Sequence, residues 1–309
     1  MPHPVIFDRK LLRARRVRAL SREPVTFLLE RAADDLAGRL AAVLRQFDVA
    51  ADLGTPGDAL RRALAGRVGS IVAVDSMALT GNRLAVVADE EALPFRDGSL
   101  DLVVSALALQ FVNDLPGTLI QIRRALKPDG LFLAAMIGGD SLIELRTAFA
   151  EAEAEIEGGV SPRVAPFADL RDIGALLQRA GFALPVTDVD RVTVRYASPL
   201  ALMHDLRRMG ASNALTERRR TPLRRATLRR MLEIYAEKFA DPDGRVRATF
   251  EIVWLSGWAP HESQQKPLQP GSAKAGQAEA VKKLAPKYPV SLPGLTRQSI
   301  VTREGSDED

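Results

Sequence analysis

Residues 49–64 have the sequence VAADLGTPGDALRRAL, in which a short apolar run leads into a turn and then into a helical pattern. The run reaches Asp52, glycine follows within two residues, and Asp58 stands where the helix begins. A strand, a glycine-containing turn and a helix in this order are typical of loops that hold a phosphate or a cofactor. Pro56 and Asp58 stand where such loops usually carry glycine. The sequence therefore raises the question of whether this loop still holds a ligand.

Apolar runs alternate with helical patterns on both sides of this loop. The apolar runs are 49–53, 71–74, 83–87, 100–106 and 131–137. Amphipathic helical spacing occurs at 25–47, 59–65 and 115–126. Short apolar strands separated by helices predict an α/β fold, a doubly wound parallel sheet with right-handed crossovers and helices on both faces.

The second half of the chain predicts further helices and two closing strands. Helices are expected at 139–157, 169–180, 199–209 and 221–240, and strands at 186–196 and 247–258. The predicted organisation is an N-terminal helical segment (1–46), a cofactor-binding core (47–197), a helical insertion (198–241), a closing strand (242–260) and a flexible tail (261–309). The tail prediction rests on its loss of apolar residues and its Pro, Gly, Gln, Lys and Ser content.

Polar residues follow the strands at the points where ligands bind in open parallel sheets. They are Asp52, Gly54, Thr55 and Gly57 after the first strand, Asp75 and Ser76 after the second, Ala88, Asp89 and Glu90 after the third, and Ser105 in the fourth. The carboxylate of Asp75 can accept hydrogen bonds from both ribose hydroxyls, and Asp89 can accept one from an adenine amine. The set predicts an adenosine site.

Composition excludes several kinds of chemistry. The 309 residues include no cysteine, which excludes disulfides, thiolate zinc sites and cysteine nucleophiles and favours a reducing cytoplasm. The apolar runs are too short to cross a membrane, so no transmembrane segment is expected. The net charge of +4 is too mild to indicate nucleic acid, and the arginine-rich stretch 217–230 lacks interleaved aromatic residues. This stretch is either a solvated helix face or a docking surface for an acidic protein, a membrane headgroup layer or, least favoured, an RNA. No metal site is expected.

Longer motifs resemble a known family. The stretches ADEEALPFRDGSLDLVVSALALQFVNDLP (88–116) and LKPDGLFLAAMIGGDSLIELR (126–146) are similar to class I S-adenosylmethionine-dependent methyltransferases, including the malonyl carrier-protein methyltransferase of biotin synthesis. Further motifs, such as LMHDLRRMGASNA (202–214) and WLSGWAPHESQQKPLQPGSA (254–273), resemble bacterial relatives of mitochondrial complex I assembly factor 5. The resemblance implies a Rossmann-like core with a seven-stranded, mostly parallel sheet and a helical insertion before the last strand.

The resemblance also implies a cofactor and its site. S-adenosylmethionine is expected in the loop from Gly54 to Asp58, with Asp75 on the ribose and Asp89 on the adenine. Ser105 and Leu107 would border the pocket where the methyl group is transferred, and Gln110 is placed there too. Arg146 is a candidate for binding an anionic substrate group.

The loop departs from the family pattern Asp-x-Gly-Cys-Gly-x-Gly, since Thr55, Pro56 and Asp58 replace the cysteine and two glycines. Proline removes an N–H and forbids positive φ, and Asp58 adds negative charge near the expected cofactor carboxylate. Three outcomes are open. Asp58 turns outward, an arginine such as Arg61 or Arg62 neutralises it, or cofactor binding is weakened. The outward position is favoured.

Two classes of function follow. The first is methyl transfer to a small acid or a protein side chain. The alternative is an assembly factor that acts on a complex I subunit, either as a protein-arginine hydroxylase or as a non-catalytic binding module. The partner is thus a small molecule or a protein, and the expected location is the bacterial cytoplasm, with peripheral attachment to the inner membrane as a variant.

Overall fold

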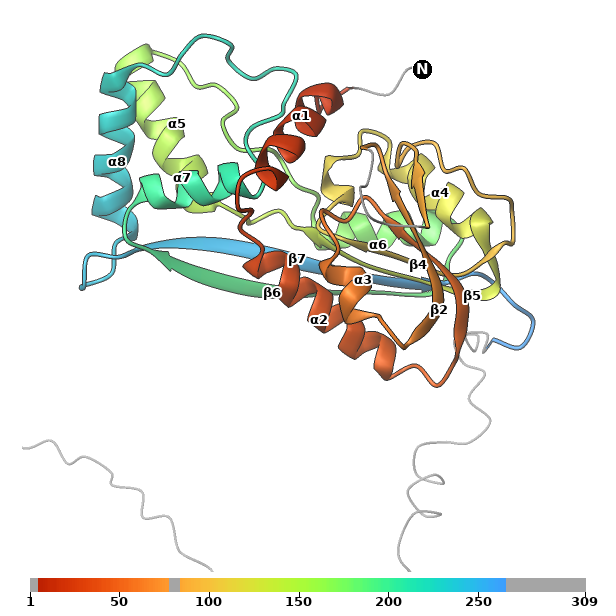
Figure 1. Cartoon of the computed structure of the whole chain (residues 1–309). Helices are drawn as coiled ribbons and strands as arrows, with labels where there is room; N and C mark the ends of the chain where they lie inside the picture. The colour runs from red at the N-terminus through yellow and green to blue at the C-terminus, as the bar shows by residue number, and fades with distance from the viewer. Residues whose placement is uncertain (1–4, 78–83, 265–309) are drawn as a thin grey trace, which may run out of the picture. The chain divides into compact units, whose positions relative to one another are not determined.

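The computed structural model describes residues 5–77 and 84–264 (Figure 1). Its helices are α1 (Arg9–Leu20), α2 (Phe27–Ala41), α3 (Ala59–Ala63), η1 (Leu109–Phe111), α4 (Leu115–Ala125), α5 (Ile143–Glu157), α6 (Leu170–Arg179), α7 (Pro199–Arg208) and α8 (Arg225–Phe239). Its strands are β1 (Phe47–Leu53), β2 (Val68–Asp75), β3 (Ala85–Val87), β4 (Leu100–Ala106), β5 (Leu126–Ile137), β6 (Ala183–Tyr196) and β7 (Val246–Trp258).

The described strands form one seven-stranded sheet in the order β3-β2-β1-β4-β5-β7-β6. Strands β1 to β5 pair in parallel, while β7 pairs antiparallel with both β5 and β6. The chain order reverses between β1 and β4, which makes their carboxyl ends the switch point where ligands bind in such sheets. The predicted fold class, a mostly parallel Rossmann-like sheet with an insertion before its last strand, is confirmed.

Helices cover both faces of the sheet because successive strand residues point to opposite sides. In β1, Ala51 and Leu53 pack with helices α4 and α6, whereas Ala50 packs with α2 and α3 on the other face. Strands β1, β4 and β5 are therefore apolar on both faces, as expected for buried parallel strands.

A third apolar cluster lies beyond the parallel strands. Strands β6 and β7 extend past the rest of the sheet, and α5, α7 and α8 pack over them (Figure 1). Tyr235 of α8 is fully buried there, and its hydroxyl donates to the Arg247 carbonyl oxygen at 2.8 Å. The insertion thus shares its core with β6 and β7.

The structure corrects several boundaries and leaves others untested. The helix predicted at 25–47 ends at Ala41, and Phe47 already belongs to β1. The helix predicted from 139 begins at Ile143, and the strand predicted from 131 begins at Leu126. The helix predicted at 221–240 begins only at Arg225, so Arg218, Arg219 and Arg220 lie in an irregular segment and not on a helix face. The predicted strand start at Arg83 and most of the predicted tail fall outside the described residues. Among the helices that the structure describes, none is long and apolar enough to span a membrane.

Candidate functional site

The loop after β1 keeps its glycine geometry despite the substitutions. Gly54 and Gly57 have φ of +66° and +73°, values that side chains rarely adopt. The Gly54 amide donates to the Val74 carbonyl oxygen at 2.7 Å, which ties the loop to the end of β2. A Cβ on Gly54 would lie 2.6 Å from Oε1 of Glu90. Glycine at this position therefore lets two strand ends approach closely.

Thr55 and Ser105 are buried and hold the loop against β4. Oγ1 of Thr55 accepts from the Ala106 amide at 2.9 Å, and Oγ of Ser105 donates to the Leu53 carbonyl oxygen at 2.7 Å. Both side chains are almost fully shielded from solvent. In this structure the threonine in the cysteine position of the pattern thus shapes the loop.

The charge on Asp58 is directed away from the loop. Its side chain is 60% exposed and forms an ion pair with Arg62, one helical turn later. Arg61 instead pairs with Asp52 and donates to the Gly57 carbonyl oxygen at 2.6 Å. The first two of the predicted outcomes therefore coexist in this structure.

Asp52 is the most perturbed carboxyl group of the loop. Burial raises its pKa to about 6, against the opposing effects of Thr55 and of the Arg61 guanidinium 2.5 Å away. Within residues 5–77 and 84–264, its Oδ1 has no hydrogen-bond partner. Asp52 therefore joins the loop to α3 through Arg61 and keeps one oxygen free.

Asp75 offers a free acceptor at the end of β2. Its Oδ1 accepts from the Met77 amide at 2.9 Å, but its buried Oδ2 has no hydrogen-bond partner among the residues that the structure describes. Burial raises its pKa, opposed by the Met77 amide and by Arg16. An unpaired buried acceptor is costly unless a donor reaches it, so Oδ2 fits a ribose hydroxyl.

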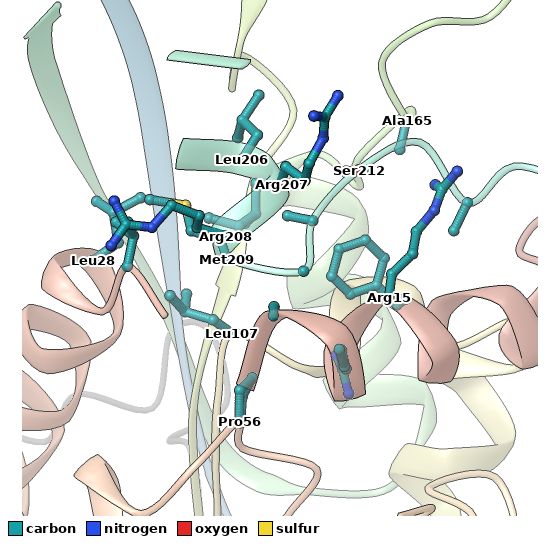
Figure 2. A pocket seen from close by; sticks show the side chains of 18 of the residues that line it. Arg15, Leu28, Pro56, Leu107, Ala165, Leu206, Arg207, Arg208, Met209 and Ser212 are labelled. Carbon is teal, nitrogen blue, oxygen red and sulfur yellow. The ribbon is translucent and has the colours of Figure 1, made fainter. Parts of the chain in front are cut away.

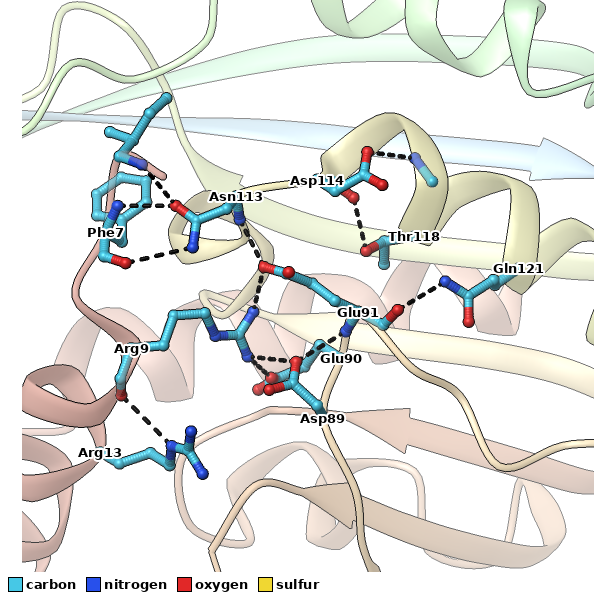
Figure 3. Close-up of polar contacts among 12 residues, drawn as sticks. Phe7, Arg9, Arg13, Asp89, Glu90, Glu91, Asn113, Asp114, Thr118 and Gln121 are labelled. Atoms are coloured by element: carbon cyan, nitrogen blue, oxygen red, sulfur yellow. Dashed lines mark hydrogen bonds and ion pairs between the residues drawn. The ribbon is translucent and has the colours of Figure 1, made fainter. Parts of the chain in front are cut away.

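The third strand end carries a carboxylate cluster that α1 neutralises (Figure 3). Arg9 contacts Asp89 at 2.9 Å and Glu91 at 2.7 Å and also pairs with Glu90. Arg16 lies 3.9 Å from Glu90. Asp89 Oδ1 further accepts from the Glu91 amide at 2.9 Å, which leaves Oδ2 of Asp89 as the acceptor for a ligand.

The carboxyl ends of strands β2 and β3 lie next to each other. The Ala88 amide donates to the carbonyl oxygen of Asp75, the last residue of β2, at 3.0 Å. Asp89, the next residue after Ala88, therefore lies close to the end of β2. Ser76 follows Asp75 directly. The residues present fit a nucleoside at Asp75, with Arg9 sharing the carboxylate expected on the adenine side.

A cavity of about 1010 Å³ opens beside this loop. Its walls come from the Pro56–Ala59 turn, α1, the residues after β4, the start of α5, α7 and the segment 209–223 (Figure 2). Nine arginines contribute to the described wall, against the acids Glu30 and Asp58, and we call it the arginine cavity. These arginines are Arg15, Arg16, Arg62, Arg163, Arg207, Arg208, Arg218, Arg219 and Arg220.

Of the four predicted pocket residues, Leu107 and Gln110 line the arginine cavity, whereas Ser105 and Arg146 do not. Leu107 has φ of +51°, and Gln110 donates from Nε2 to the Leu107 carbonyl oxygen at 2.8 Å. In the described part of the chain, the buried Oε1 of Gln110 has no hydrogen-bond partner. The Arg146 guanidinium instead donates to the carbonyl oxygen of Ala165, a residue of the cavity wall, at 3.2 Å.

Sequence reasoning missed the contribution of α1. Arg9, Leu12, Arg16 and Ala19 recur at helical spacing, and all four are largely buried. Arginines on the apolar face of an amphipathic helix are a signal for buried carboxylate partners. That signal was available in the sequence.

Comparison with known proteins agrees with this fold. Residues 51–134 match the family model of a methyltransferase domain. A solved protein from Bacillus halodurans, described as a methyltransferase, aligns with a TM-score of 0.51 over 74% of this chain and 99% of its own, at 18% identity. The fold and this match define a class I S-adenosylmethionine-dependent methyltransferase fold.

The particular family is shown by longer alignments. The chain is 38% identical over 289 residues to the mitochondrial arginine-hydroxylase NDUFAF5 of Danio rerio, covering 90% of each protein, and it belongs to this family. It is 41% identical over 180 residues to the malonyl-[acyl-carrier protein] O-methyltransferase of Gallionella capsiferriformans, covering 58% of this chain and 59% of that one. Both predicted resemblances are confirmed.

Proposed function

We propose that this chain binds S-adenosylmethionine at the strand ends and transfers its methyl group to an acceptor in the arginine cavity. The acceptor would be a small acid or a protein side chain. The observation that carries the proposal is the free, buried Oδ2 of Asp75, located at the same edge of the sheet as the loop that borders the cavity.

The proposed cofactor site uses the strand-end residues. Asp75 would accept from the ribose, and Asp89 from the adenine amine. The Gly54–Gly57 turn would face the amino-acid portion, with fewer amide donors than usual because Pro56 has none. Ser76, Ala88 and Glu90 would complete the wall around the nucleoside.

The chemistry proposed for the site depends mainly on orientation. When bound, S-adenosylmethionine supplies an electrophilic methyl group on a sulfonium centre. The protein would hold an acceptor's lone pair in line with that methyl group and exclude water, a contribution that requires no dedicated base. Leu107 and Gln110, at the end of β4, border both the loop and the cavity.

Calorimetry with S-adenosylmethionine tests the cofactor site. We expect micromolar binding by the purified chain and a loss of about tenfold for Asp75→Asn, because a hydrogen bond to a charged acceptor is removed. Asp97→Asn is the matched control, since Asp97 is 66% exposed and pairs with Arg124 on the surface. Absence of heat up to millimolar ligand would contradict the proposal.

A second candidate is favoured by family membership. Relatives at about 40% identity are named arginine-hydroxylases, and the family resemblance implies a role in assembling respiratory complex I. The chain would then act on a complex I subunit, by hydroxylation or by binding alone. Deleting the gene should lower complex I activity.

The isolated subunit distinguishes these possibilities. Mass spectrometry of this subunit from deletion and complemented cells would reveal a lost methyl group, a lost oxygen or no change. Complementation with Asp75→Asn separates cofactor use from binding, because a pure binding module should function with that substitution.

A further inference from the structure

We infer that the arginine cavity binds an anionic group, a carboxylate or a phosphate, carried on a partly apolar molecule. The inference deepens the proposed function and rests on it only for the claim that this molecule is the methyl acceptor. The binding itself requires no cofactor.

Most of the cavity's arginines already have carboxylate partners. Among the described residues, Arg16 pairs with Glu90, Arg62 with Asp58, Arg163 with Glu153, Arg208 with Glu23, Arg218 with Asp8 and Arg219 with Glu157. Within the same described part of the chain, Arg15, Arg207 and Arg220 form no ion pair. The wall therefore carries three guanidinium groups that form no ion pair with any described carboxylate.

The surplus is concentrated where α1 meets the segment after α7. Arg15 donates to the Asn213 carbonyl oxygen, a neutral acceptor that leaves its charge uncompensated. Burial and the neighbouring Arg218 lower its pKa, as expected among like charges. Asp8 lies near Arg15, Arg218 and Arg220, so one carboxylate faces three guanidinium groups.

The positions of these side chains suit a ligand entering from solvent. Arg207 and Arg220 are exposed, whereas Arg15 is half-buried. Figure 2 shows the guanidinium groups of Arg15 and Arg207 in the upper part of the view, with Leu107 and Pro56 below them. Guanidinium groups bind carboxylates and phosphates through paired N–H donors.

The rest of the wall indicates what carries the charge. Apolar side chains line the interior, including Leu142, Leu145, Phe149, Met203 and Phe250. A volume of about 1010 Å³ exceeds what a bare inorganic anion fills. The cavity thus fits an anionic head near the arginines and an apolar body against these residues.

Four probes of equal chain length test the inference without cofactor. Calorimetry would compare hexanoate, hexyl phosphate, hexanol and hexylammonium. We expect at least one anion to bind about tenfold or more tightly than the alcohol and the cation, and its affinity to fall with added salt. The stronger anion identifies the head group as carboxylate or phosphate. Equal binding of all four probes would overturn the inference.

Substitutions locate the site. Arg15→Gln, Arg207→Gln and Arg220→Gln should each weaken the preferred anion by about tenfold, since each removes a charge-assisted hydrogen bond. Arg225→Gln is the matched control, because Arg225 is exposed on α8 and does not line the cavity. If Arg15→Gln lowers the unfolding temperature, Arg15→Lys, which keeps the charge, should retain most of the binding.

The outcomes separate this inference from the proposed function. Anion binding that is lost in the three glutamine variants but kept in the control supports it, even when S-adenosylmethionine fails to bind. Unchanged anion affinity in all three variants would overturn it, even when the cofactor binds as proposed.

Discussion

Asp52 links the loop to α3 at the cost of burying a carboxyl group. It is 1% exposed, and its pKa of about 6 lies above the ordinary value of 3.8 because burial outweighs the attraction of Arg61. A raised pKa means that the folded chain binds a proton more tightly than the unfolded chain. The resulting stabilisation is present below pH 4 and is lost as the pH rises through 6.

This titration predicts a pH-dependent difference between wild type and Asp52→Asn. From pH 4 to pH 7 the free energy of unfolding of the wild type should fall by roughly 2 kcal/mol relative to the variant, since one pKa unit corresponds to about 1.4 kcal/mol and part of the effect is already lost at pH 4. Urea denaturation of both proteins across this range measures the difference. Parallel pH profiles would show that Asp52 does not titrate as described.

The two loop glycines provide a matched pair of substitutions. Gly57→Ala places a side chain at positive φ with nothing within 4 Å, so it should cost about 1 kcal/mol of strain alone. Gly54→Ala adds a contact of 2.6 Å with Glu90 and should destabilise the chain further. Thermal unfolding measures both effects. Equal losses would indicate that Glu90 moves freely away from the loop.

At the scale of elements, ion pairs of Arg9 attach α1 to the residues that follow β3. Arg9 is 13% exposed and Glu90 only 3%, so their ion pair is shielded from water. Asn113 adds to this attachment, because its Oδ1 accepts from the Phe7 amide at 2.7 Å (Figure 3). Phe7 and α1 are thus attached to the residues that follow β3 and β4.

Removing the ion pairs of Arg9 should loosen α1 selectively. Arg9→Gln leaves Glu90 without its closest partner and should cost ~3 kcal/mol, so that the amides of α1 exchange hydrogen much faster. Hydrogen–deuterium exchange on the intact protein measures this. Arg13→Gln is the control, since the exposed Arg13 donates, among the described residues, only to the Arg9 carbonyl oxygen. Similar exchange in both variants would contradict the role of Arg9.

At the scale of the described molecule, the helical insertion and the sheet are joined by apolar residues that contact both. Leu107 and Val192 pack against both the α2–α3 cluster and the cluster of α5, α7 and α8. Shared apolar contacts therefore join the helical insertion to the sheet. Residues 5–77 and 84–264 should unfold in a single transition.

Met231→Ala tests this coupling. Met231 is fully buried in α8, so its truncation should cost about 2–5 kcal/mol. Both tryptophans of the chain lie in β7, so their fluorescence reports on the sheet, while circular dichroism reports on all helices. The two midpoints should shift equally. A separate helical transition would show that the insertion unfolds on its own.

Local patterns determined the architecture and the candidate acids. Apolar runs and helical spacing specified the parallel strands, and the topology of such sheets then placed Asp75 and Asp89 at one edge. The start of α8 was misplaced, because Thr221 and Pro222 resemble an N-cap and a first helical residue, whereas the helix begins only at Arg225.

What only the tertiary structure decided was which side chains meet at that edge. Arg9 and Glu90 are 81 residues apart in sequence, and α1, α7 and the segment 209–223 supply the arginine cavity from distant parts of the chain. Such pairings depend on how helices pack over the sheet, which periodicity along the chain does not encode. The sequence determined the strand-end acids because their positions follow from local strand boundaries, whereas the charge around them follows from long-range packing.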